Sequence, residues 1–343
     1  MRSEPLEPPA VLLERPQPQR RHIAKILSVV VSGLLLVGLY RAVDVRLIGA
    51  ALMRADRVWL VISIGMILPI TVLRAIRFYW VAPPGGLPGV GEALRLTLVA
   101  SAVNVVAPAK AGDLIKSYFV AKRSETSTGV ALAIIVYERL CDLVGLISWC
   151  VLGWVVARPD VPGVPSELWM MLAVVGAICT VLILSRRVAA LLPALITRLR
   201  PHGRGRLRRL AEGWPGLLRA LRGRRRWILP FSLLLWLGHL VQIWMFTFAL
   251  QAPLSFTTCA SLSAIALIAG QLPLTVAGLG ARDVALVVLM SRYMAAESAA
   301  AMGILIATRN LVPPLFGIPI MGPYLSSALA EAQRWRREMD AAE

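Results

Sequence analysis

The sequence predicts an all-α fold, a polytopic bundle of transmembrane helices. Of the 343 residues, 57% are hydrophobic and only 16% are charged, and the mean hydropathy of +0.70 is far above that of a soluble globular domain. Several apolar stretches approach or exceed the roughly 20 residues that a helix needs to cross a bilayer. The arginines gather between these stretches. We therefore expect about eight spans plus at least one broken or re-entrant segment.

The net charge of +18 fits a membrane surface better than nucleic acid, because the arginines flank apolar stretches. We expect membrane lipids as partners and no nucleic acid, and whether the protein forms a homo-oligomer stays open. The four cysteines and three histidines lack the spacing of a disulfide framework or a zinc site. A P-loop and a catalytic triad motif are also missing, so the sequence predicts no cofactor, no metal and no catalytic residue.

The first part of the chain predicts a tail and two spans. Residues 1–22 are basic and rich in proline, which is typical of a disordered cytoplasmic tail. The apolar stretch 23–40 is expected to stay as an anchor, because no small-residue cleavage site follows it. A second span is predicted at 58–80, and prolines and glycines at 83–89 then break the chain.

The stretch 94–108 is apolar but too short to cross a bilayer. If the basic tail and the basic loop 110–123 are both cytoplasmic, the two complete spans between them already give an even number of crossings. We therefore expect 94–108 to re-enter the membrane and to turn at Asn104 and Pro108. The basic loop 41–57 would then lie outside, which is evidence against this topology.

Two further spans, at 128–156 and 167–185, are predicted to flank an external loop. The linker 186–226 contains 13 arginines and is the strongest cytoplasmic marker in the chain. Five apolar side chains recur in it at three- and four-residue steps and share one helix face. They are Leu207, Leu210, Trp214, Leu217 and Leu221. The helix either lies on anionic lipid headgroups or belongs to a linker that only fixes orientation.

The last part of the chain predicts a span at 227–250 and three apolar stretches at 258–277, 284–306 and 311–328. His239 lies inside the first of these spans, where a lone histidine is more often hydrogen-bonded to a neighbouring helix than catalytic. The tail 329–343 is basic. A transmembrane domain at 23–328 with both termini cytoplasmic, in a bacterial inner membrane, is therefore expected.

Two interruptions of the apolar pattern resemble one another. Each has an amide, proline, glycine and then an acid that opens a new helix. The first consists of Asn104, Pro108, Gly112 and Asp113, and the second of Gln271, Pro273, Gly278, Gly280 and Asp283. Paired interruptions in the two halves of a membrane protein point to a substrate site, because broken helices expose backbone groups that bind charged headgroups. The alternative is a chance match, since proline and glycine are common in transmembrane helices.

Charged residues within the predicted spans are candidates for binding, because burying them in hydrocarbon is costly. Glu138 and Asp142 share a helix face, with Arg139 about 100° away from Glu138. Cross-helix partners for them are Lys110, Lys116, Arg74 and Arg77. The candidate substrate-binding residues are Asn104, Lys110, Asp113, Lys116, Glu138, Arg139, Asp142, Arg282, Asp283 and Arg309. These charges form either an ion-paired staple for the bundle or a headgroup or proton pathway.

Taken in order, these motifs resemble the transmembrane region of lysylphosphatidylglycerol synthases, which also occurs alone as a flippase-like membrane protein family. The motifs are Arg74-x2-Arg77, Asn104-x3-Pro108-x3-Gly112-Asp113-x2-Lys116, Glu138-Arg139-x2-Asp142, Pro273-x4-Gly278-x-Gly280-x-Arg282-Asp283 and Arg309. The resemblance covers residues 23–328. Asp113, Lys116 and Asp283 stand where the family usually has glutamate, arginine and glutamate, so the charges are kept and each carboxylate reaches less far by one methylene.

The resemblance implies a protein that binds an anionic or polyisoprenoid lipid and translocates it between leaflets. Lys110, Lys116, Arg282 and Arg309 would hold the headgroup. Three carboxylates would serve as counter-charges or proton carriers: Asp113, Glu138 and Asp142. The two interruptions should then meet, with Asp113 and Arg282 facing one polar cavity.

The alternative is a membrane-embedded enzyme or accessory subunit of lipid, hopanoid or glycolipid synthesis, with Glu138 or Asp142 as a base. The aminoacyl-transfer domain of the full synthases is not expected here, since only 15 residues follow the last predicted span.

Overall fold

The computed structural model describes residues 30–39, 41–106, 111–159, 165, 167–185, 187–188, 190–191, 198, 206–271 and 280–340. Among them no strand occurs, which confirms the all-α prediction. Five helical segments are long and apolar enough to cross a membrane: Arg57–Val81, Thr128–Ala157, Glu167–Leu184, Arg225–Ala249 and Ala296–Ala328. Two shorter apolar helices occupy Val30–Leu39 and Phe256–Gln271. The total of eight spans stays a prediction.

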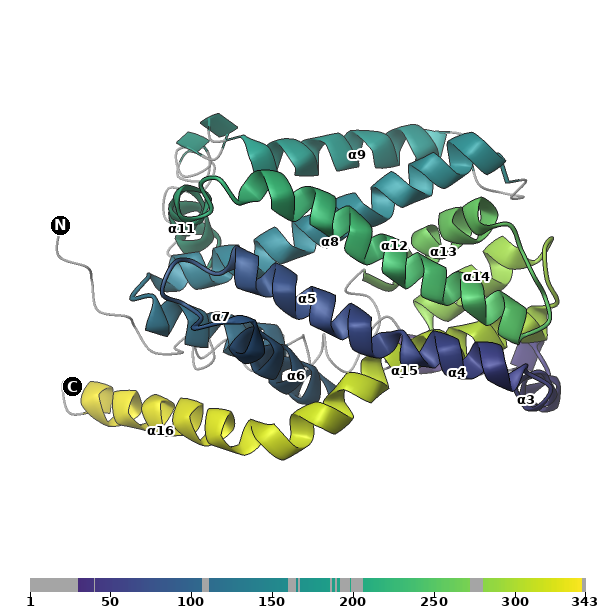
Figure 1. Cartoon of the computed structure of the whole chain (residues 1–343), viewed down its shortest axis with the longest axis horizontal. Helices are drawn as coiled ribbons and strands as arrows, with labels where there is room; N and C mark the ends of the chain where they lie inside the picture. The colour runs from purple at the N-terminus through teal and green to yellow at the C-terminus, as the bar shows by residue number, and fades with distance from the viewer. Residues whose placement is uncertain are drawn as a thin grey trace.

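The first half of the chain forms α3 (Val45–Met53), α4 (Arg57–Gly65), α5 (Ile67–Val81), α6 (Val90–Val106), α7 (Ala111–Arg123), α8 (Thr128–Ala157) and α9 (Glu167–Leu184). Asp56 starts α4, because its carboxylate accepts from the backbone N–H of Val58 and Trp59. Pro69 has no N–H to donate to Gly65, so α4 and α5 are separate helices on nearly one line (Figure 1). They match the predicted span 58–80.

The second half forms α11 (Arg206–Ala220), α12 (Arg225–Ala249), α13 (Phe256–Gln271), α14 (Ala281–Met290), α15 (Ala296–Gly317), a short 3-10 turn (Ile318–Ile320) and α16 (Met321–Asp340). The predicted stretches 284–306 and 311–328 are divided differently here. A turn at 291–295, which begins with the exposed Ser291 and Arg292, separates α14 from α15. By contrast, α15 continues through Arg309 and the buried Pro313 and Pro314.

Long helices cross the molecule side by side, and the two interrupted helix pairs lie toward its opposite ends. In Figure 1, α5, α12 and α8 cross the middle of the bundle and α9 runs along its upper edge, with α6 and α7 at one end and α13 and α14 at the other. One apolar core surrounds Phe78, Tyr137 and Leu217, and a second surrounds Phe246 and Leu286. The interruptions are thus embedded in separate cores of one bundle.

Helix α11 carries the predicted apolar face, but this face is covered by protein. Trp214, Leu217 and Leu221 are buried, and the ring of Trp214 lies 6.0 Å from that of Tyr137 on α8. The apolar face therefore packs against α8, and the location of the arginine-rich side on anionic headgroups stays a prediction. Leu207, at the start of the helix, is exposed. The four cysteines are free and buried, as the apolar runs around them predict.

Candidate functional site

The first interruption is a tight helical hairpin formed by α6 and α7. The Asn104 side chain accepts a hydrogen bond of 2.9 Å from the backbone N–H of Gly112, which ties the end of α6 to the start of α7. Asp113 is the third residue of α7 and therefore lies in its first turn, as predicted. Pro108 and Lys110, which are between the two helices, lie outside the described residues.

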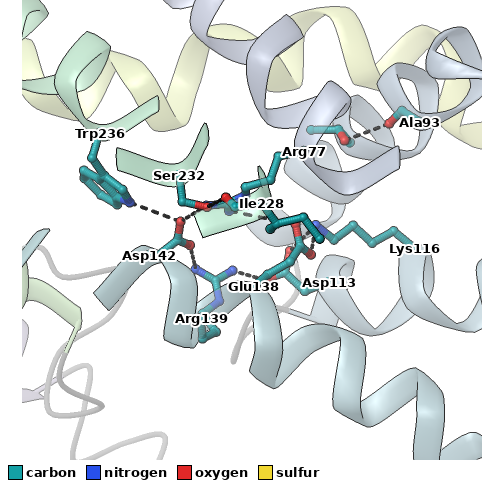
Figure 2. A network of polar contacts seen from close by, with 11 residues as sticks. Arg77, Ala93, Asp113, Lys116, Glu138, Arg139, Asp142, Ile228, Ser232 and Trp236 are labelled. Carbon is teal, nitrogen blue, oxygen red and sulfur yellow. Dashed lines mark hydrogen bonds and ion pairs between the residues drawn. The ribbon is translucent and has the colours of Figure 1, made fainter. Parts of the chain in front are cut away.

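Six charged side chains from α5, α7 and α8 meet next to this hairpin (Figure 2), and we call them the ion network. It consists of Arg77, Asp113, Lys116, Glu138, Arg139 and Asp142. Lys116 Nζ lies 2.7 Å from Glu138 Oε2. Arg77 Nη1 lies 2.6 Å from Asp142 Oδ1, and its Nη2 lies 3.9 Å from Glu138 Oε1. The predicted pairing of Glu138 with lysine and arginine across helices is therefore confirmed.

The remaining contacts close the ion network into a ring. Arg139 forms an ion pair with Asp113, and its Nη1 lies 3.7 Å from Asp142 Oδ2. Lys116 Nζ lies 3.9 Å from Asp113 Oδ1. Every carboxylate thus contacts two cations and every cation two carboxylates. Since three positive and three negative groups take part, the ion network has no net charge.

Side chains from α12 and α5 also contact the ion network. The indole Nε1 of Trp236 donates a 3.2 Å hydrogen bond to Asp142, and Arg77 donates a 3.5 Å hydrogen bond to the hydroxyl of Ser232. The ammonium of Lys116 lies 4.4 Å from the centre of the Phe78 ring, which attracts it through the negative face of the aromatic system. These neighbours hold the charged groups in fixed positions.

Five side chains of the ion network are largely buried, and the sixth, that of Arg139, is partly exposed. The side chains of Arg77, Lys116, Asp113, Glu138 and Asp142 are only 4–13% exposed, whereas that of Arg139 is 36% exposed. A buried carboxylate or ammonium group needs partners to offset its lost hydration. Arg139 is therefore the most exposed member of the ion network.

The second interruption neutralises its charges locally. Gly280 precedes α14 with φ +91, a backbone conformation that favours glycine, and its N–H donates 3.0 Å to Asp283 Oδ2. Arg282 Nη2 lies 2.6 Å from Asp283 Oδ1 and donates 2.9 Å to the backbone carbonyl of Gly303 on α15. Asp283 is the third residue of α14, as Asp113 is of α7. Pro273 and Gly278 lie outside the described residues.

Arg309, the last predicted site residue, lies on α15 in the middle of the molecule. Its guanidinium stands 5.9 Å from the ring centre of Trp236, and it lines a cavity together with Arg74 on α5. Neither Asp113 nor Arg282 lines this cavity. It is therefore not the polar cavity that these two residues were expected to share. Lys116 and Arg282, both expected to hold a headgroup, already bind carboxylates.

Sequence reasoning considered only His239 on α12 and missed the other polar side chains of this helix. Ser232 and Trp236 contact the ion network, while His239 and Gln242 line the cavity beside Arg309. Successive steps of four, three and three residues place these side chains on one face of the helix. The signal was therefore a polar stripe along an otherwise apolar span.

Residues 25–317 match the family model described as the lysylphosphatidylglycerol synthase transmembrane region. Searches of curated proteins and of solved structures gave no match. The matched segment contains the ion network, both interruptions and the cavity, and together with the long apolar helices it identifies a multi-pass membrane protein. The chain therefore belongs to the lysylphosphatidylglycerol synthase transmembrane region family.

Proposed function

We propose that the protein binds an anionic or polyisoprenoid lipid within the bilayer and moves it from one leaflet to the other. The observation that supports this most is the ion network, six charged side chains gathered beside a broken helix in a membrane bundle. Intramembrane ionisable groups are costly and mark the paths of charged substrates. Membership of a family named for lipid synthesis points to a lipid as that substrate.

The composition of the ion network favours binding over a purely structural role. Replacing a buried ion pair by apolar side chains of similar volume is often neutral or stabilising, so a bundle gains little stability from ion pairs that leucine could not provide. A balanced ring has another property. Because every charge has two partners, an incoming charged group can replace one partner while the other is kept.

Arg139 is the residue at which such an exchange starts. It is the most exposed member of the ion network and joins Asp113 on α7 to Asp142 on α8. A phosphate group of a lipid that bonds to Arg139 competes with both carboxylates, and arginine binds phosphate through two parallel hydrogen bonds. Loosening the contact with Asp113 removes one of the two described ion pairs between α7 and α8, while Lys116–Glu138 keeps the helices together, and gives the headgroup a polar path beside the α6–α7 hairpin.

The orientation that we propose places both termini and the arginine-rich linker 186–226 on the cytoplasmic side of a bacterial inner membrane. Arg208, Arg219 and Arg222 are exposed on or directly after α11, whose apolar face packs against α8. This arrangement directs positive charge away from the bundle. Anionic headgroups of the inner leaflet attract such charge by about 1 kcal/mol per arginine, which favours lipid capture from that leaflet.

Lipid exchange in liposomes tests the proposal. The purified full chain is reconstituted with labelled phosphatidylglycerol or a labelled polyisoprenyl phosphate, and the label accessible from outside is followed over time. We expect the wild type to accelerate exchange, Arg139→Gln to slow it, and Arg57→Gln, which removes an exposed arginine outside the ion network, to match the wild type. Exchange no faster than in empty liposomes for every anionic lipid, or equal rates for wild type and Arg139→Gln, would contradict the proposal.

Lipid profiling of a deletion strain separates transport from synthesis. We expect a normal inventory of lipids with an altered distribution between leaflets. A missing lipid product would instead support a membrane-embedded enzyme or an accessory subunit.

A further inference from the structure

A small polar cavity lies between α5, α12 and α15, outside the ion network. Its volume is about 30 Å³, and its polar lining comes from Thr71 and Arg74 on α5, His239 and Gln242 on α12, and Arg309 and Asn310 on α15. A cavity of this size holds a water molecule or an oxygen atom of a larger ligand. Among the described residues, no carboxylate contributes to its lining.

Several polar atoms at this cavity have no partner within the described parts of the chain. They are Arg309 Nη1, His239 Nδ1 and Gln242 Oε1, each buried and without a hydrogen bond. His239 is 6% exposed and Gln242 is fully buried, with its Nε2 held by a 2.8 Å hydrogen bond to the carbonyl of Ser63. A buried donor or acceptor without a partner costs about 1–3 kcal/mol. Three of them around one cavity indicate that something is bound there in the functional protein.

The charges around the cavity give the sign of that ligand. Arg74 and Arg309 form no ion pair with any carboxylate that the structure describes, and each lies close enough for its charge to act on the other. Asp142, whose charge acts on both arginines, is already paired with Arg77 and Arg139. Since the ion network and the Arg282–Asp283 pair are each neutral, the two arginines leave this region with two uncompensated positive charges.

We propose that this cavity binds a phosphate group, with Arg74 and Arg309 as the residues that neutralise it. A phosphate mono- or diester carries one to two negative charges, and the planar guanidinium group matches its oxygens with two parallel donors. One phosphate oxygen fits inside the cavity. The others stay at its mouth, next to the exposed Asn310. Gln242 Oε1 accepts from a bound water or a P–OH group, and His239 Nδ1 donates when it carries the ring proton.

This inference deepens the proposed function, on which it rests only for the source of the phosphate. A lipid headgroup and free inorganic phosphate present the same group to the two arginines. Binding to the cavity also requires no movement of lipid, so it can be measured separately from exchange between leaflets.

The test is calorimetric titration of the full chain in a neutral detergent. One arm uses inorganic phosphate, a second uses short-chain phosphatidylglycerol, and a third uses a short-chain diacylglycerol that lacks phosphate. We expect wild type to bind at least one of the two phosphate-bearing ligands and not the diacylglycerol. Arg309→Gln and Arg74→Gln should each weaken binding about 10- to 100-fold, the loss expected for a hydrogen bond to a charged group.

Two further variants keep the result interpretable. Arg57→Gln removes one exposed arginine elsewhere and should bind as the wild type does. Arg309→Lys keeps the charge but loses the paired donors, so its affinity should lie between those of wild type and Arg309→Gln. If Arg309→Gln does not fold, Arg309→Lys should still bind more weakly than wild type. Binding of phosphatidylglycerol alone identifies a lipid site, and binding of inorganic phosphate identifies a site for the free anion as well.

Failure of both phosphate-bearing ligands to bind wild type, or affinities of Arg74→Gln and Arg309→Lys equal to that of wild type, would overturn the inference. Exchange in liposomes with unaltered binding by these variants would overturn the phosphate site and leave the proposed function standing. If the variants lose binding and the wild type shows no exchange, the phosphate site stands and the proposed function is overturned.

Discussion

The two interruptions share an order of residue types and differ in how their charges are neutralised. At the first, Asp113 opens α7 and belongs to an ion network that joins three helices. At the second, Asp283 opens α14 and pairs with its own neighbour Arg282, whose remaining donor reaches only the Gly303 carbonyl. The same local pattern thus produces a long-range network in one half and a closed local unit in the other.

The motif therefore determines where a helix begins, but it does not determine which cation pairs with the acidic residue of the motif. An acid in the first turn of a helix is favoured by the exposed N–H groups and by the helix dipole. Its second partner depends on which helices pack against it. Two charged residues of α8, Glu138 and Arg139, contact α7, whereas α15 contributes only the backbone carbonyl of Gly303, which accepts from Arg282.

The largest expected effect is that of Arg77→Ala in the ion network. It leaves Glu138 with one cation and Asp142 with Arg139 alone, and an uncompensated buried charge costs about 3–5 kcal/mol. Equilibrium unfolding in mixed micelles should show this loss in the free energy of unfolding. Arg57→Ala, an exposed control, should change it by less than about 0.5 kcal/mol. A loss below about 1 kcal/mol for Arg77→Ala would mean that the pairs are solvated like surface ion pairs.

Arg282→Ala should destabilise less than Arg77→Ala. Asp283 loses its only described cation, but it still accepts from the Gly280 N–H and lies at the positive end of α14, which offsets part of the lost charge pairing, so about 1–3 kcal/mol is expected. The same unfolding measurement gives the value. An effect as large as that of Arg77→Ala would show that the second interruption is not a local unit.

Backbone proximity should also distinguish the interruptions. A Cβ at position 112 would lie 2.0 Å from the carbonyl oxygen of Ala100, and one at position 303 would lie 2.6 Å from Asp283 Oδ1. The backbone of α6 around Ala100 cannot move away from an added methyl group, whereas the carboxylate of Asp283 can rotate away from it. Gly112→Ala should therefore cost about 1–3 kcal/mol and Gly303→Ala less. Gly91→Ala, with open space around it, is the control and should be neutral or slightly stabilising; equal losses for positions 112 and 303 would contradict this comparison.

The smallest expected effect is the coupling between the two interruptions. Arg77 and Arg282 share no partner, so the losses of the double variant Arg77→Ala and Arg282→Ala should add to within about 0.5 kcal/mol. Within the ion network, Lys116→Met and Glu138→Gln should deviate from additivity by about 0.5–3 kcal/mol. Strong coupling between Arg77 and Arg282 in this double-mutant cycle would mean that the two units act as one.

Much of the fold followed from the sequence, because apolar length and helix-start residues are local signals. The spans around α5, α8, α9 and α12 begin and end within a few residues of their predicted limits. The stretch 284–306 was harder. Its turn at 291–295 contains no proline or glycine, while Pro313 and Pro314 lie inside a continuous helix. Proline and glycine, the residues that usually end helices, therefore predicted a break near residue 313 and not at the turn 291–295.

The candidate site was predictable in its members and less so in its connections. Buried charge was expected from Glu138 and Asp142, whose shared face followed from helix geometry, and Lys116 was expected as a partner across helices. Which cation stays without a carboxylate depends on packing between α5, α12 and α15, and no spacing along the chain encodes that. Arg309 and Arg74 therefore emerged as the uncompensated pair only in three dimensions.

Trp236 gives the bundle a built-in optical reporter. Its indole N–H bonds to Asp142 of the ion network, and the face of the same ring lies against the guanidinium of Arg309. Indole emission responds to the charges and hydrogen bonds around the ring, so events on either side of this one side chain alter the same fluorescence signal. With the other tryptophans replaced, occupancy of the cavity and rearrangement of the ion network become visible in the unlabelled protein in real time.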